Sequence, residues 1–277
     1  MTRTLHPRAL VLLAKDSLPG RIIQAYGGHQ ISNYASSLAF RLLMSTFPLL
    51  VGILALLSTA LHSAAEERQL AQEIASFFPS TAVTTVMHAL TVLRKNTGIL
   101  GIISTLGLLW SGSSIFSSLE WPLDTLYGVP SRSALRKRGM ALTMTMVYVV
   151  AIPGTIVLTG AVTTISHRPA LPIVLSLMVW TAVLLLMYRA IPNTSLGLRD
   201  VWKGALTAGV LLELLTSIWP AYIHLVHGFD SYGAILALFF VLATWMYFLA
   251  RIFLLGVVIN TLPQTNTHGK RQNAPHV

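Results

Sequence analysis

The sequence contains few charges and very few acidic residues. Only 10% of its 277 residues are charged and nine are Asp or Glu, whereas a soluble domain carries about a quarter charged residues. Cysteine is absent, which excludes disulfides, a thiolate nucleophile and a cysteine-held metal. The sequence also lacks a phosphate-binding P-loop motif, so we expect no ATP hydrolysis. Together these absences argue against a soluble domain and against several enzyme classes.

Long apolar runs account for most of the chain. Each is near or above the ~20 residues that a helix needs to cross ~30 Å of hydrocarbon. Inside lipid, a backbone satisfies its own hydrogen bonds only as a helix or a closed barrel. The sequence therefore predicts an all-α fold, a polytopic bundle of six transmembrane helices. The predicted spans are 38–61, 99–119, 140–165, 171–190, 202–226 and 232–260.

The basic residues are unevenly distributed between the two sides of this topology. Thirteen of the 19 Lys and Arg fall on the side of both termini, four fall on the other side, and two lie within the spans. Such a bias predicts that both termini are cytoplasmic. Basic loops attract anionic lipid, so membrane lipids are the expected partners and the charge of +10 requires no nucleic acid. A homo-oligomer stays open.

Composition divides the chain into a lead, a membrane domain and a tail. Residues 1–35 form a cytoplasmic lead, in which 21–34 is either an interfacial helix or a flexible arm. We expect no cleavable signal peptide, because the apolar run near the N-terminus is too short. The membrane domain covers 36–263 and includes an outer loop, 62–98, with the pattern of two short amphipathic helices. The polar tail, 264–277, is expected to be disordered.

Three ionisable residues lie within the predicted spans: Arg41, Glu213 and Arg251. Each is costly in hydrocarbon, by ~2.5–3.5 kcal/mol on insertion scales. Glu213 and Arg251 lie at equal depth, roughly 13 Å from the cytoplasmic surface, in helices joined by a short turn. We expect them to pair. The pair either fixes helix register, with Arg41 reaching the headgroups, or belongs to an anion-attracting cavity open to the cytoplasm.

The second predicted span is rich in small and polar residues, among them Ser111 and Ser114. Small residues let helices pack closely in lipid, which is the simpler interpretation; a polar lining of a substrate path is the other. After this span, Glu120 and Asp124 share one helix face at a spacing of four. We expect them to form ion pairs with the basic run 136–138 rather than to act as acid–base groups or metal ligands. No metal or cofactor is expected.

Several different short motifs occur along the chain, in a characteristic order. The residues singled out by them are Pro48, Tyr188, Pro192, Asn193, Gly204, Tyr232, Gly233 and Gly256. Together with Leu109-Trp110-Ser111, these motifs resemble the YihY/BrkB family of bacterial inner-membrane proteins, once labelled ribonuclease BN. The resemblance implies six transmembrane helices in the inner membrane. It also implies a transporter or an envelope factor, as family members are generally described.

Two residues depart from the family pattern. Arg41 stands where members usually have an aromatic or small residue, and Val258 stands where many have glutamate. If that glutamate matters to the family's function, this chain is altered in it.

The function expected is therefore a transporter or flippase-like permease for an anionic or amphiphilic solute. Its candidate path residues are Arg41, Glu213, Arg251, Ser111 and Ser114. The main alternative is a non-catalytic assembly scaffold of the envelope. An enzyme is the weakest hypothesis, because the acidic residues are scattered and no H-E-x-x-H or H-x-H-x-D run is present.

Overall fold

The computed structural model describes residues 31–60, 97–148, 170–225 and 234–272, together with Gly27, His88 and Thr91. Over this part of the chain every regular element is a helix, which confirms the all-α class. The helices are α3 (Ile31–Ala60), α6 (Thr97–Tyr127), α8 (Ala170–Ala190), α9 (Leu198–Leu225) and α10 (Ala234–Gln272). A further helical segment, 134–148, follows α6.

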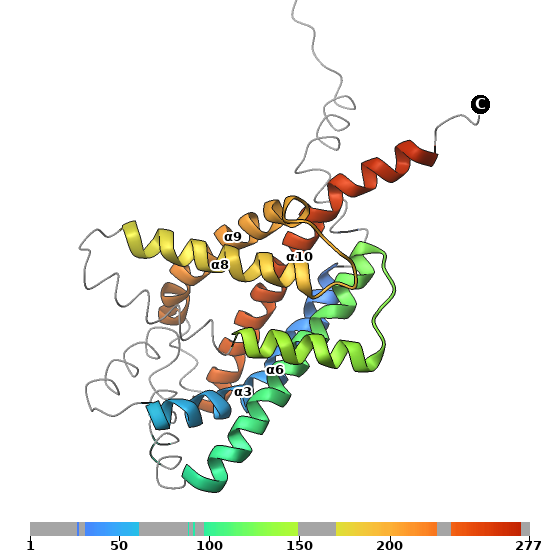
Figure 1. Cartoon of the computed structure of the whole chain (residues 1–277). Coiled ribbons are helices and arrows are strands. Elements are labelled where there is room, and N and C mark those ends of the chain that lie inside the picture. Colours follow the sequence, from blue (N-terminus) through green and yellow to red (C-terminus); the bar gives the residue numbers. More distant parts are fainter. Residues whose placement is uncertain are drawn as a thin grey trace, which may run out of the picture.

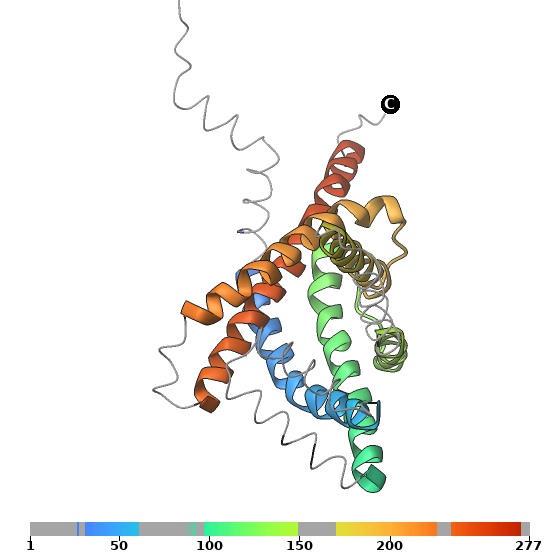
Figure 2. The same ribbon diagram turned by 90° about the vertical axis from the view of Figure 1, so that its left-hand side faces the viewer.

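Helix α10 is the centre of the arrangement. It contacts α3, α6 and α9, while α3 packs along α6 and α8 packs along α9. Figures 1 and 2 show α10 running between these two helix pairs. The largest buried cluster accordingly draws side chains from all five helices, such as Leu38, Leu123, Leu184, Val201 and Leu254.

Helices α3 and α6 run in opposite directions, and so do α9 and α10. In α3 and α6, Tyr34 contacts Trp121 and Ser45 contacts Ser114, so the residue number rises on one helix as it falls on the other. In α9 and α10, Gly204 contacts Asn260 near one end and Trp219 contacts Trp245 farther along. The alternation agrees with a chain that crosses back and forth.

The connections 128–133 and 191–197 and the C-terminal half of α10 meet at one end of the molecule, which we call the basic end. This end carries Arg132, Arg136, Lys137, Arg138, Arg189, Arg199 and Lys203. The charge distribution predicts that the basic end faces the cytoplasm.

The outer surfaces of the helices are strongly apolar. Large side chains such as Ile173, Met178 and Ile218 are exposed, as expected where lipid rather than water is the solvent. Three helices in the described part are long and apolar enough to cross a membrane, over Ile173–Ala190, Leu198–Ile223 and Phe239–Leu262. The six-span topology as a whole stays a prediction, because 140–165 is described only as far as residue 148.

One boundary differs from the sequence prediction. Helix α10 continues to Gln272, well into the tail that was expected to be disordered from residue 264. A helix once formed adds one hydrogen bond for each further residue, so it can extend beyond its apolar stretch. The predicted lead 1–35 up to residue 30, the predicted outer helices of 62–98, and the motif residues Tyr232 and Gly233 lie outside the described residues.

Candidate functional site

The C-terminus of α6 shapes the turn on which the site depends. Gly128 has a φ of +66°, a left-handed conformation that costs glycine little. Its N–H donates to the Thr125 carbonyl at 3.2 Å, and the Val129 N–H donates to the Asp124 carbonyl at 2.9 Å. This pattern is a Schellman motif, which satisfies the last carbonyls and turns the chain away from the helix axis. The segment 128–133 can therefore fold back beside the last turns of α6.

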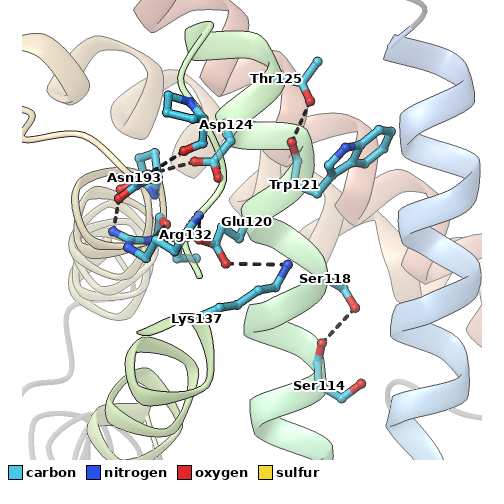
Figure 3. A network of polar contacts seen from close by, with 12 residues as sticks. Ser114, Ser118, Glu120, Trp121, Asp124, Thr125, Arg132, Lys137 and Asn193 are labelled. Atoms are coloured by element: carbon cyan, nitrogen blue, oxygen red, sulfur yellow. Dashed lines mark hydrogen bonds and ion pairs between the residues drawn. The ribbon is translucent and has the colours of Figure 1, made fainter. Parts of the chain in front are cut away.

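Glu120 lies at the centre of this fold-back and is fully buried. Its Oε1 lies 3.3 Å from Nη1 of Arg132, and its Oε2 lies 3.6 Å from Nζ of Lys137. Figure 3 shows Lys137 reaching this carboxylate from the start of the helical segment 134–148. Two cations thus face one buried carboxylate, as a charge removed from water requires.

Arg132 also joins this cluster to the end of α8. Its Nη2 donates to the carbonyls of Pro192 at 2.7 Å and Ala190 at 3.3 Å, and its Nη1 donates to the carbonyl of Ile191. Helix α8 stops here because Pro192 has no N–H and restricts the residue before it. The carbonyls left without intrahelical donors are satisfied by one planar guanidinium.

Asp124, one turn after Glu120 on α6, binds the segment that follows α8. Its Oδ1 accepts a hydrogen bond of 2.8 Å from the backbone N–H of Asn193, and the Asn193 side chain donates to the Pro130 carbonyl at 2.7 Å. Asp124 is 1% exposed. The motif residues Pro192 and Asn193 therefore hold the end of α8 against the end of α6 (Figure 3).

The motif residues Tyr188, Gly204 and Gly256 form a second contact at the basic end, where α8, α9 and α10 meet. The Tyr188 hydroxyl donates to the Phe253 carbonyl at 2.8 Å, and the buried Gly204 N–H donates to Oδ1 of Asn260 at 2.8 Å. Gly204 and Gly256 face each other so closely that a Cβ on either would collide with the other's carbonyl oxygen. Small residues at such crossings let helices approach closely in lipid.

Tyr127, the last residue of α6, reaches this second contact. It lies beyond the predicted span 99–119, and its hydroxyl faces the side chain of Asn260. Burial raises the pKa of the Tyr127 hydroxyl, because an apolar environment disfavours the phenolate. Tyr127 therefore stays neutral at physiological pH.

The structure gives Glu213 a hydrogen-bond partner on α8, and its predicted pairing with Arg251 stays a prediction. Oε2 of Glu213 accepts a hydrogen bond of 2.5 Å from Ser176 of α8. The ion pairs described above, those of Glu120 with Arg132 and Lys137, lie apart from this contact. Arg251 lies over the Tyr247 ring, 5.3 Å from its centre.

Helical phase explains why the equal depth of Glu213 and Arg251 does not bring them to facing surfaces of α9 and α10. Gly204 of α9 contacts Asn260 of α10. Glu213 lies nine residues after Gly204, and Arg251 lies nine residues before Asn260. The two side chains therefore lie at the same depth, as predicted. Nine residues are about two and a half turns of helix. Both side chains therefore lie on faces turned away from the α9–α10 contact.

The two serines and Arg41 have different surroundings. Ser111 is 1% exposed and donates to the Ser45 carbonyl of α3, while Ser114 is exposed and lies 3.5 Å from the Ser45 hydroxyl. Pro48 lies one turn after Ser45 and cannot donate to the helix ladder, so a hydroxyl from α6 supports a weakened stretch of α3. These positions favour the packing role that the sequence left open for Ser111. Arg41 is exposed on the surface of α3.

Two residues central to the site were missed at the sequence level. The sequence pointed to 136–138 as partners of the acidic pair; Lys137 of this run does pair with Glu120, but Arg132, which lies outside the run, is the second partner. The signal for Arg132 was its position four residues after Gly128, because a glycine there favours the end of a helix and a turn of the chain. Asn260 was a lone amide at the end of an apolar run, and a polar side chain placed there needs a partner.

The chemistry available at the basic end is that of buried oxygens and fixed cations. Among the described residues, no group of three or more His, Cys, Asp or Glu gathers as transition-metal ligands would. The cluster joins two separate stretches of chain, 120–137 and 190–193, around two buried carboxylates. Such a cluster can hold two helix ends together or bind a small ion.

The apolar helices and the buried polar contacts between them define an integral membrane protein of the helical class. The family model for virulence factor BrkB matches residues 22–277, and the chain belongs to this family. The chain is also 26% identical over 263 residues to the ribonuclease-like protein YfkH of Bacillus subtilis (strain 168), covering 87% of this chain and 93% of that protein. No solved structure matches the chain.

Proposed function

We propose that this chain is a permease of the bacterial inner membrane, a transporter or flippase-like protein for an anionic or amphiphilic solute. The observation that carries the proposal is that two ionisable side chains, Glu213 and Arg251, are half-buried well inside two helices of membrane length. Glu213 lies roughly 22 Å along α9 from Leu198. Ionisable groups at such depth are costly and typically mark a solute or ion pathway.

The packing at the basic end is consistent with a permease closed on that side. From Arg251 toward the basic end, α10 is tightly enclosed: Phe253, Leu254, Val257 and Val258 are all buried. The contacts of Arg132 and Asp124 hold the ends of α6 and α8 together. Alternating access requires such a closed state on one side at a time.

The same solid packing favours a second candidate function, a non-catalytic scaffold of the envelope. A scaffold needs a rigid bundle and no route for a solute. We propose that the chain has no nuclease activity, although one relative is named ribonuclease-like. The two buried carboxylates, Glu120 and Asp124, are held by cations and backbone groups rather than grouped with further acidic or histidine ligands.

Flux measurements distinguish the permease from the scaffold. The purified chain is reconstituted into vesicles that are loaded with a panel of labelled phospholipids and organic anions. We expect flux of at least one solute, reduced about tenfold or more in Arg251→Gln, a loss of ~1.4 kcal/mol or more of transition-state stabilisation. Arg136→Gln, at an exposed arginine of the basic end, is the matched control and should transport normally. A folded wild-type chain without flux for any member of the panel would favour the scaffold.

A further inference from the structure

Asp124 differs from the other buried charges at the basic end. Glu120 has a cation at each of its two oxygens. Asp124 accepts a single hydrogen bond from the Asn193 N–H at Oδ1, and its buried Oδ2 has no hydrogen-bond partner among the described residues. Its position in the last turn of α6 adds the negative end of the helix dipole. A carboxylate that is 1% exposed requires more compensation than one neutral amide provides.

The charged groups around Asp124 do not supply that compensation. Arg132 and Lys137 both bind Glu120. The Nη2 group of Arg132 donates to carbonyls at the end of α8. On α9, Asp200 is acidic and accepts from the Gly197 N–H at 2.8 Å, which caps its own helix. Arg189, in the last turn of α8, is exposed.

The oxygens beside Asp124 suit a hard cation. Glu120 lies one turn earlier on the same face of α6, and its buried Oε2 has Lys137 Nζ at 3.6 Å but accepts no hydrogen bond among the described residues. Carboxylate and carbonyl oxygens select hard cations over transition metals. A divalent ion is disfavoured, because Arg132 and Lys137 already neutralise Glu120 and calcium typically uses six to eight oxygens.

We propose that Asp124 is a binding site for a small monovalent cation such as Na⁺, at the C-terminal end of α6. Glu120 Oε2 supplies a second carboxylate oxygen on the same helix face. The cation neutralises Asp124 and so stabilises the contact of α6 with the Asn193 segment. This site does not depend on the permease function, since a scaffold would be stabilised in the same way.

Thermal unfolding of the purified full chain in detergent tests the site. Sodium, potassium or lithium chloride is compared with choline chloride at equal ionic strength. We expect one of these alkali cations to raise the midpoint saturably, on the order of 5 °C. Asp124→Asn, which keeps the acceptor for the Asn193 N–H, should lose this response. Glu213→Gln, which changes a carboxylate elsewhere, should keep it.

A second measurement uses only the wild-type chain and so decides the matter even if Asp124→Asn does not fold. The alkali cation that raises the midpoint should slow modification of Asp124, but not of Glu213, by a carbodiimide, as read by peptide mass spectrometry; a side chain that is 1% exposed reacts only through local opening, which the bound cation opposes. The proposal is overturned if no alkali cation acts differently from choline, or if Asp124→Asn responds like the wild type. It is also overturned if calcium or magnesium gives the larger response, or if pH alone reproduces the effect. None of these outcomes bears on solute flux, so the two proposals fail independently.

Discussion

Gly204 and Gly256 determine how closely α9 and α10 approach at the basic end. At both positions a Cβ would meet the backbone of the facing helix, and at Gly256 it would also meet the Tyr188 hydroxyl. The close approach lets Asn260 reach the Gly204 N–H and Tyr188 reach the Phe253 carbonyl. Each of these hydrogen bonds is buried, so each would be costly to leave unmade.

Replacing Gly256 by Ala should therefore destabilise the chain. We expect a loss of about 2 kcal/mol in the free energy of unfolding, because overpacking against backbone cannot be relieved by a rotamer change. Denaturant or thermal unfolding in detergent, followed by the fluorescence of the six tryptophans, measures it. Gly139→Ala is the matched control, since a Cβ there meets nothing within 4 Å and alanine favours helix by about 1 kcal/mol. Equal stability of the two variants would contradict the packing described.

At the scale of elements, α9 presents different faces to its two neighbours. Gly204 faces α10, whereas Gly209 packs against Thr181 of α8 and Glu213, one turn later, bonds Ser176 of the same helix. Equal depth is therefore not enough for two side chains on α9 and α10 to meet. Translation and rotation of each helix have to agree.

Double-mutant cycles in the free energy of unfolding separate the two possible partners of Glu213. For Glu213→Gln with Arg251→Gln we expect additivity within about 0.5 kcal/mol, because the two lie on faces turned away from the α9–α10 contact. For Glu213→Gln with Ser176→Ala we expect a coupling of about 0.5–1.5 kcal/mol, the typical net value of a hydrogen bond. The reverse order of couplings would restore the ion pair predicted by sequence.

At the scale of the whole molecule, the largest group of polar contacts between helices lies at the basic end, whereas the contacts of Ser111 with Ser45 and of Ser176 with Glu213 lie within the spans. Arg132, Asp124 and Asn193 connect the ends of α6 and α8, and Gly204 with Asn260 connects α9 and α10. Elsewhere the outward faces are apolar, as on α8. The molecule thus has one strongly cross-linked end, and the charge distribution predicts that this end faces the cytoplasm.

Single cysteines test this orientation, and the chain is suited to them because it has none of its own. Ser131→Cys and Ser195→Cys lie in exposed positions of the two connections at the basic end. A membrane-impermeant maleimide should label both in inverted vesicles and neither in intact cells. The unsubstituted chain is the control for background. Labelling of the two positions from opposite sides would contradict the topology.

Much of the fold could be predicted from the sequence because hydrocarbon imposes one simple demand on the backbone. The runs 171–190 and 202–226 nearly coincide with α8 and α9. The motif residues Tyr188, Asn193, Gly204 and Gly256 were recognised as structural, and all four lie in contacts at the basic end. The spacing of Glu120 and Asp124 likewise indicated their shared face, and the nearby basic residues indicated the cationic surroundings of Glu120.

The sequence by itself determined which stretches are apolar helices, where along each helix a polar group lies, and which end of the molecule is basic. These follow from composition and from the fixed rise of a helix, which converts residue number into depth. Only the tertiary structure decided that Glu213 bonds Ser176 and that Arg132, rather than the run 136–138, crosses to the end of α8. The physical reason is rotation: the packing of facing side chains sets how each helix turns about its axis, and that packing involves residues far apart in the chain.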